Sequence, residues 1–170
     1  LVGSEMCIRD RLTSYSLYVD SIGPWFTENV DSKWLELRQK LMSLLQEEAE
    51  LEEIVKMVGM DALSAPDRLK MEAARSIRED YLHQNSFHEI DTYTSLKKQQ
   101  MMMELVIGFY EQSAEALSEG ADVEGLIKMP VREAIGRFKY TPEDSLDREF
   151  TRINNQLSVE IANTFSKEEF

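Results

Sequence analysis

Two aromatic residues, Phe87 and Tyr93, lie six positions apart in a short polar stretch. An amphipathic helix that carries Ile77 and Tyr81 is predicted to end just before them, near Gln84. Two rings on a short connection could form a clamp that stacks on a flat π system, such as a nucleobase, without reading its identity strongly. The alternative is that both rings fill the core, because a buried aromatic needs no ligand to explain it. Spacing alone favours the core interpretation.

A second group with chemical potential, Glu79, Asp80 and His83, precedes the aromatic pair. On a helix these side chains could share one face in a carboxylate–histidine arrangement. A di-metal bundle needs that motif twice, with further glutamate ligands from facing helices, and the chain has one copy. We therefore expect no metal site. These groups are expected to form hydrogen bonds or ion pairs with Arg75 or Arg78.

Sequence signatures of catalysis are absent from the chain. It has no glycine-rich loop ending in Gly-Lys-Ser or Gly-Lys-Thr that could wrap nucleotide phosphates. Ser, His and Asp residues are present, but no nucleophile elbow or strand is predicted that would give them triad geometry. We therefore name no catalytic residue and expect that nucleotide hydrolysis does not reside in this chain alone.

Length, composition and charge narrow the class of protein. The chain has 170 residues, 42% of them hydrophobic, and a formal net charge of −13, which fits one modest domain with its own core. The acidic balance argues against nucleic acid as a partner, because a phosphate backbone is bound through clustered Lys and Arg. It also argues against adsorption to anionic lipid, and no apolar run approaches the ~20 residues of a membrane span. Any membrane association must go through partners.

Residues 1–11 do not fit the pattern of the rest and resemble a translated adaptor sequence. We expect this segment to be non-native and exclude it from fold reasoning, so the expected helical domain spans residues 12–170. The segment contains Cys7, the only cysteine. Without it the chain has no thiol for a disulfide or a cysteine-based zinc site, which suits a cytoplasmic protein.

Helical periodicity begins after an entry segment. Residues 12–30 are expected to be irregular, with Gly23-Pro24 as punctuation. A long acidic helix is predicted over residues 31–57, with Asp31 as its N-cap. Its apolar stripe, interrupted by Glu48, is expected to contain Trp34, Leu37, Leu41, Leu44 or Leu45, Leu51, Val55 and Val58.

A helix-turn-helix tip is predicted after the long helix. Gly59 suits a helix end, while Ser64, Pro66 and Asp67 are residue types that start a helix. The following helix is expected to bury Leu69, Ala73, Ile77 and Tyr81.

The next helix is predicted to start after Ser95 and to end at Gly120. It contains three consecutive methionines, at positions 101–103. Three neighbours cannot share one helix face, so some must meet a second surface. Adaptable core filling is favoured over a methionine-lined binding groove.

The C-terminal part is expected to be helical as well. Short pieces are predicted over 123–129 and 131–138. A final helix has Thr141 as its expected cap, Pro142 at its first position and Asp144 as the reciprocal cap. No stretch alternates with period two long enough to indicate a sheet, so the predicted class is an all-α bundle. The stripe of the final helix is Leu146, Phe150, Ile153, Leu157, Ile161 and Phe165.

Four stretches occur in an order that is more specific than any one of them. They are Leu-Thr-Ser-Tyr-Ser-Leu-Tyr at 12–18, the acidic helix of 31–57, Val-Gly-Met-Asp-Ala-Leu-Ser-Ala-Pro-Asp-Arg-Leu at 58–69, and residues 77–95. Together they resemble the C-terminal helical domain of the catalytic A subunit of V/A-type ATP synthases and, more distantly, the F-type beta subunit. The resemblance implies a fragment that lacks the nucleotide-binding α/β domain.

The resemblance also implies roles for the aromatic pair. In the family the phosphate loop and the catalytic carboxylate lie in the preceding domain, and a neighbouring subunit supplies an arginine. Matching the turn residue by residue places Phe87 and Tyr93 at two adenine-contacting positions, although the F-type enzyme has Phe where this chain has Tyr93. A third pocket aromatic would lie just upstream of Leu12. The intact subunit is expected to hold ATP or ADP with Mg, and the fragment alone is expected to hold neither.

The tip matches the family's lever loop, which touches the rotating central stalk. Compared with the acidic F-type version, carboxylates are replaced at Ala62, Ala65 and Pro66, while Leu63 remains. The departure favours a steric push over a purely electrostatic contact. The residues implied to contact the rotor are Asp61, Ala62, Leu63, Ser64, Ala65, Pro66 and Asp67.

The resemblance implies a rotary function: coupling of ATP synthesis or hydrolysis to proton or sodium transport. Implied partners are B subunits in an alternating hexameric ring and the central stalk subunits, in a cytoplasmic sector that meets the membrane only through the complex. The alternative is a stand-alone acidic helical interaction module with a methionine-rich surface. The rotary subunit predicts apolar surface exposed at the N-terminal edge and two rings facing a shared cleft, whereas the module predicts a bundle closed on every side.

Overall fold

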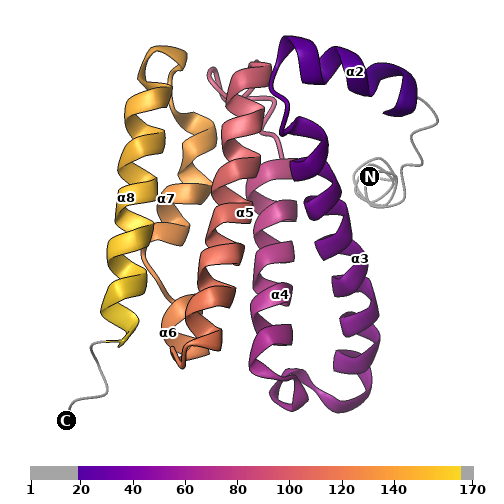
Figure 1. Ribbon diagram of the computed structural model, residues 1–170, viewed down its shortest axis with the longest axis vertical. Helices are drawn as coiled ribbons and strands as arrows, with labels where there is room; N and C mark the ends of the chain where they lie inside the picture. Colours follow the sequence, from indigo (N-terminus) through magenta and orange to yellow (C-terminus); the bar gives the residue numbers. More distant parts are fainter. Residues whose placement is uncertain (1–18, 166–170) are drawn as a thin grey trace.

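The computed structural model describes residues 19–165, and every regular element among them is helical. This confirms the predicted all-α class for the described part, while segment 1–11 and the boundary at residue 12 lie outside it. The elements in chain order (Figure 1) are α2 (Val19–Asn29), α3 (Trp34–Val58), the 3-10 turn η1 (Met60–Ala62), α4 (Ala65–Ser76), the π-helical η2 (Ile77–Leu82), α5 (Leu96–Ser118), α6 (Val123–Ile127), α7 (Val131–Arg137), the 3-10 turns η3 (Phe138–Tyr140) and η4 (Glu143–Ser145), and α8 (Leu146–Phe165).

Helix α4 runs through the middle of the bundle (Figure 1). It packs against α3 on one side and α5 on the other, and α5 also packs against α8. Helix α2 crosses one end of the bundle ahead of α3. The α3–α4 connection lies at the opposite end from the η2–α5 connection (Figure 1), so α4 and η2 join the predicted tip directly to the aromatic turn.

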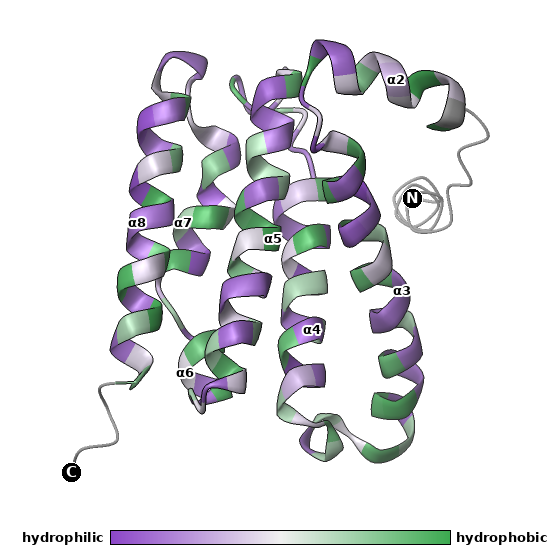
Figure 2. Ribbon diagram, in the orientation of Figure 1, coloured by the Kyte–Doolittle hydropathy of each residue, from purple (hydrophilic) through white to green (hydrophobic). Residues whose placement is uncertain are grey.

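Apolar residues of the long helices face the interior (Figure 2). The stripe of α4 and η2 is confirmed, since Leu69, Ala73 and Ile77 are buried and Tyr81 is partly buried against the core. The stripe of α8 is confirmed except at its end, where Phe165 is 40% exposed; its buried residues are Leu146, Ile153 and Leu157. Within residues 19–165 no helix combines the length and apolar character needed to cross a membrane. The α3 stripe holds over its first half, where the buried residues are Trp34, Leu37, Leu41, Leu44, Leu45 and Glu48.

The methionine run of α5 fills the core, as predicted. Met102 and Met103 are buried, and the partly buried Met101 packs against the same core cluster. The flexible thioether side chain can follow an irregular gap between helices. The alternative interpretation, a methionine-lined binding groove at this position, is therefore wrong.

The predicted helix ends are confirmed at the tip and around α5. Ser64 Oγ accepts the Asp67 N–H at 3.3 Å, and Ser95 Oγ accepts the Lys98 N–H at 3.1 Å. Gly120 has a φ of 105°, a conformation that glycine adopts without a Cβ penalty.

Residues 19–29 form a helix, so the predicted irregular segment is wrong over this range. Helix α2 contains Pro24, which removes one backbone donor. The Phe26 ring stacks on Trp34 with centroids 4.9 Å apart, and Trp25 meets Phe26 edge-on at 5.2 Å. These ring contacts offset the local cost of placing Gly23-Pro24 in a helix. A sequence pattern of helix-breaking residues carries no information about such contacts.

The last helix begins at Leu146, so the predicted start at Pro142 is wrong. Thr141 and Pro142 have extended backbone, and a 3-10 turn separates them from the helix. The Asp144 carboxylate accepts the Ser145 hydroxyl at 2.9 Å instead of completing a capping box. The Thr141 carbonyl is engaged by a residue of α5 that is distant in sequence, which a local motif cannot predict.

Periodicity did not predict the π-helical segment η2, which continues α4 toward the aromatic turn. The His83 N–H donates to the Arg78 carbonyl at 3.0 Å, five residues earlier. π-helical turns are rare in proteins, but those that do occur are often found at functional sites.

Helix α7 packs closely against η2 at Gly136, so even one added methyl group there should destabilise the fold. A Cβ at Gly136 would lie 2.7 Å from Oδ1 of Asp80, so we expect Gly136→Ala to lower the free energy of unfolding by about 1–3 kcal/mol. The measurement is urea denaturation followed by circular dichroism. The control is Gly108→Ala in α5, where the new Cβ meets only Gln112 Nε2 at 3.7 Å, so better helix propensity should add about 0.5–1 kcal/mol. Stabilisation by both variants would contradict the close contact.

Candidate functional site

Phe87 and Tyr93 stand on the surface of the turn that joins η2 to α5. Their exposed fractions are 97% and 85%, so the core-packing interpretation favoured by spacing is wrong. The Phe87 N–H donates to Asn85 Oδ1 at 3.0 Å, a local turn that competes with helix continuation. The ring contacts among residues 19–165 involve other side chains, so both aromatic faces are open.

The turn is fixed by hydrogen bonds of its own polar side chains. Asp91 is buried, and its Oδ2 accepts the Asn85 N–H at 2.6 Å. Gln84 Nε2 donates to the Asp91 carbonyl at 2.7 Å, and the Thr92 hydroxyl donates to the His88 carbonyl at 2.7 Å. A stretch without regular secondary structure therefore has its buried polar groups paired, as a defined conformation requires.

A small cavity lies behind the turn, between η2 and α5. Its volume is about 240 Å³. Burial raises the pKa of Tyr81, one of its walls, to about 12. Neither ring of the pair lines it, so the cleft that two facing rings would share is not this cavity; its lining is Tyr81, Leu82, Gln84, Asp91, Thr94, Gln99 and Met102.

The predicted rotor-contact loop lies at the opposite end of α4. Leu63, the apolar residue expected to push, is only 9% exposed and belongs to the buried set. Asp67 and Ser64 are occupied in starting α4. The loop therefore offers little apolar surface of its own; its exposed members are Asp61, Ala62, Ser64 and Pro66, and its half-buried members are Ala65 and Asp67.

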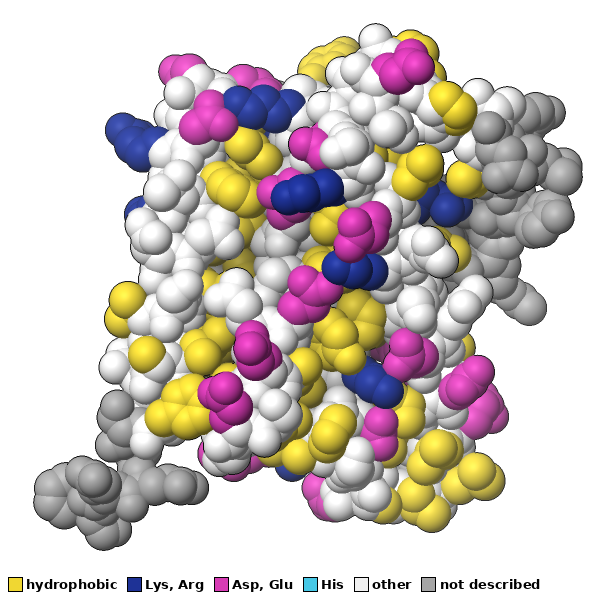
Figure 3. All heavy atoms as spheres, in the orientation of Figure 1, with side chains coloured by type: hydrophobic (Ala, Val, Ile, Leu, Met, Phe, Trp, Pro, Cys, Tyr) yellow, Lys and Arg dark blue, Asp and Glu magenta, His cyan; other side chains and the backbone are white. Residues whose placement is uncertain are grey.

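Exposed apolar side chains lie just before that loop, which the sequence analysis missed. We call Ile54, Met57, Val58 and Met60 the apolar ridge; Met57 and Val58 are 76% and 60% exposed. Figure 3 shows apolar side chains gathered at this end of the molecule beside acidic ones. Ile54 and Met57 lie off the α3 stripe, and that surplus of apolar residues on the polar face was the available signal.

Glu79, Asp80 and His83 do not converge. Glu79 pairs with Arg75 at 3.0 Å, as predicted, while Asp80 lies against Gly136 and His83 is exposed. Burial is the main cause of the raised pKa of Asp80. Within the described part of the chain no group of three or more His, Cys, Asp or Glu residues is arranged to hold a metal ion.

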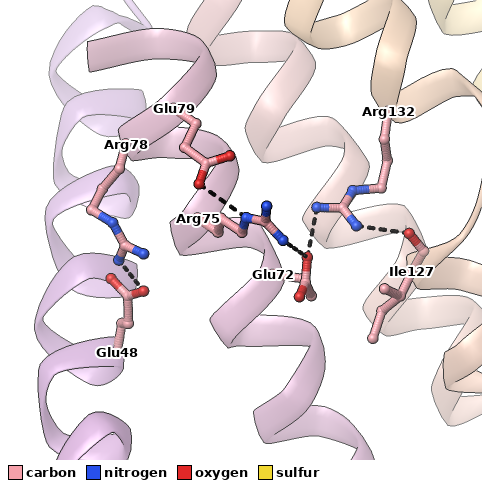
Figure 4. Close-up of polar contacts among 7 residues, drawn as sticks. All are labelled: Glu48, Glu72, Arg75, Arg78, Glu79, Ile127 and Arg132. Carbon is pink, nitrogen blue, oxygen red and sulfur yellow. Dashed lines mark hydrogen bonds and ion pairs between the residues drawn. The ribbon is translucent and has the colours of Figure 1, made fainter. Parts of the chain in front are cut away.

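Ion pairs tie α4 and η2 to their neighbours (Figure 4). Arg132 of α7 donates to Glu72 of α4 at 2.8 Å and to the Ile127 carbonyl at 2.7 Å. Arg78 of η2 pairs with Glu48 of α3, a carboxyl that is 3% exposed. Burial raises the pKa of Glu48 although the Arg78 charge lowers it. The two pairs connect the central helix to both sides of the bundle.

One family model matches the part of the chain that contains most of the features described above. Residues 23–127 match the model described as the C-terminal domain of V and A type ATP synthase. The matched range contains the aromatic turn, the predicted rotor-contact loop and the apolar ridge.

Curated relatives are similar over nearly the whole chain. It is 56% identical over 157 residues to the V-type ATP synthase alpha chain of Acetivibrio thermocellus and 53% identical over 156 residues to that of Clostridium botulinum strain Okra. It is 49% identical over 156 residues to the V-type ATP synthase alpha chain 1 of Clostridium tetani. These alignments cover 92% of this chain but only 27%, 26% and 26% of the relatives. With more than half of its residues inside the family match, the chain belongs to the family of C-terminal domains of V- and A-type ATP synthases.

Proposed function

We propose that this chain works as the C-terminal part of the nucleotide-binding catalytic subunit of a rotary V/A-type ATP synthase or ATPase. In that role it couples ATP synthesis or hydrolysis to proton or sodium transport by contacting the central rotor. Catalysis itself belongs to a preceding domain, because this chain has no phosphate loop. The fragment alone is then inactive.

The observation that carries the proposal is the presentation of two open rings on a fixed turn. Phe87 and Tyr93 expose nearly their whole side chains, so a ligand or a neighbouring domain that covers the rings would gain apolar contact. A planar π system such as adenine can stack on such a face. In the intact subunit the nucleotide, ATP or ADP with Mg, would lie between this turn and the preceding domain.

A continuous helical rod connects the tip to the aromatic turn. Helices α4 and η2, of 12 and 6 residues, span roughly 25 Å at a rise of about 1.5 Å per residue. They join the tip to the turn without a break in the helix. Because packed helices move as rigid bodies, a displacement at the turn would reach the tip.

The apolar ridge at the tip is the surface on which we expect a partner. The apolar ridge presents Met57 and Val58 beside the loop that carries Asp61 and Asp67. We assign the central stalk as the partner of this surface. Because Leu63 is buried, the residues that push on the stalk are those of the apolar ridge. B subunits in an alternating ring complete the assembly, which is cytoplasmic and meets the membrane only through its other subunits.

The stand-alone interaction module is the weaker candidate. It called for a methionine-rich binding surface at 101–103, and Met102 and Met103 are buried. It also called for a closed bundle. Large apolar residues are instead exposed on α2, at the tip and on the aromatic turn, where examples are Trp25, Met57 and Phe87, which fits a domain that packs against others.

Loss of either ring should weaken nucleotide binding. The assay enzyme is a rotary ATPase whose Acetivibrio thermocellus alpha chain carries this chain in place of the matching 157 residues. We expect Phe87→Ala and Tyr93→Ala to raise the KM for ATP roughly 5- to 100-fold, since a base–aromatic stack contributes about 1–3 kcal/mol. Tyr93→Phe keeps the ring and should stay near the parent value. Phe165→Ala, at a residue 40% exposed on α8, is the control; unchanged KM values in both alanine variants would refute the adenine contact.

Polar substitution of the ridge should weaken the rotor contact. We expect Met57→Ser with Val58→Ser to reduce the affinity of the assembled catalytic ring for isolated central stalk subunits by roughly tenfold or more, because each loses about 1–2 kcal/mol of apolar burial. The measurement is calorimetric titration of the stalk into the ring.

Val159→Ser provides a matched control for the ridge, since Val159 and Val58 are both 60% exposed. Asp61→Asn with Asp67→Asn tests the electrostatic alternative and should change the affinity by less than the ridge variant. A larger loss in the aspartate variant would reverse the assignment from steric to electrostatic.

A further inference from the structure

The segment that joins α7 to α8 runs behind the aromatic turn. We call residues 138–143 the brace. Although the two segments lie some fifty residues apart in the sequence, brace residues contact the turn at its beginning, its middle and its end. The turn's own hydrogen bonds set its internal shape, whereas the brace sets how that shape sits on the bundle.

The beginning of the turn is held by a buried ammonium group. Lys139 is 7% exposed, and its Nζ donates to the Glu79 carbonyl at 3.0 Å and to the His83 carbonyl at 3.3 Å. These carbonyls lie where η2 ends, and carbonyls at a helix C-terminus lack intrahelical donors. A cation there satisfies them and also meets the negative end of the helix dipole.

The middle and the end of the turn are held by the residues that follow. The Tyr140 ring packs on the His88 ring with centroids 4.4 Å apart. The Ser95 hydroxyl, which caps α5, donates to a Glu143 carboxylate oxygen at 2.8 Å. From α5 the fully buried Lys98 donates to the Thr141 carbonyl at 2.8 Å, so the brace is itself anchored to the helix that the turn precedes.

We propose that the brace aims the two exposed rings and that Lys139 is a positioning residue for the nucleotide. The proposal rests on the proposed adenine contact of Phe87 and Tyr93. Lys139 touches no ring of the pair. It fixes the end of η2 from which the turn departs, and a small change of direction there is magnified at Phe87, the more exposed of the two rings.

Hydrogen exchange of the 170-residue chain tests the positioning directly. Lys139→Met leaves two carbonyls without their donor, so we expect the amides of Asn85 and Phe87 to exchange about tenfold faster while the α5 core amides keep their rates. Lys139→Arg retains a cation and should restore most of the protection. Lys128→Met is the control, because Lys128 is an exposed lysine that pairs with Glu124 of its own turn.

A second variant covers the case in which Lys139→Met does not fold. Glu143 is exposed, so Glu143→Gln should leave the bundle intact and raise exchange at the turn in the same direction, by about threefold. Unchanged exchange at the turn in both brace variants, or a uniform rise over every helix, would overturn the proposal.

Kinetics of the hybrid ATPase separate positioning from general stability. We expect Lys139→Met to raise the KM for ATP about fivefold with kcat within about twofold, the pattern of lost uniform binding. Lys139→Arg should recover the KM, and a fall in kcat alone would overturn the positioning role. Phe87→Ala serves as the reference. If it leaves KM unchanged, the adenine contact fails, while the exchange rates still decide whether the brace fixes the turn.

Discussion

The close approach of α3 and α5 to α4 is the constraint on which the bundle depends. Ala73 and Ala74 are 0% exposed, and such small side chains let neighbouring backbones come near where a larger residue would not fit. Leu69 and Ile77 fill the space along the same helix. The tip and the aromatic turn are attached to the two ends of this central element, so its packing sets the position of both.

The two ends are specified by different physics. Toward the turn the buried polar residues gather, among them Asp91, Lys98 and Lys139, and each needs a partner because an unpaired buried charge is costly. Such bonds are directional and select one geometry. Toward the tip large apolar side chains are exposed beside acidic ones, as at Met57 and Asp61, and apolar contact has no preferred direction. In the proposed function, a fixed turn suits placement of the nucleotide, whereas non-directional apolar contact at the tip suits a partner that presents changing faces.

The sequence predicted what local patterns encode. Apolar spacing identified the faces of α4, of the first half of α3 and of most of α8, and side-chain chemistry identified the starts at Ser64 and Ser95. It failed where distant residues decide. The extended segment ahead of α8 is bound by Lys98 of α5 at the Thr141 carbonyl, and the end of η2 is bound by Lys139, whose partners lie 56 and 60 positions away. The exposure of Phe87 was equally invisible, because spacing cannot tell an outward ring from an inward one.

The open faces of Phe87 and Tyr93 have a mechanical consequence in the proposed assembly. One exposed surface covers only one side of a planar ligand, so the other wall must come from outside the described residues. Stacking needs contact at van der Waals distance and weakens steeply as a gap opens. A bundle that moves as one rigid body would therefore change the nucleotide's environment when the tip moves, and by the same linkage nucleotide binding would bias the tip. The turn needs no conformational change of its own, and the bonds that hold it rigid make the tilt effective.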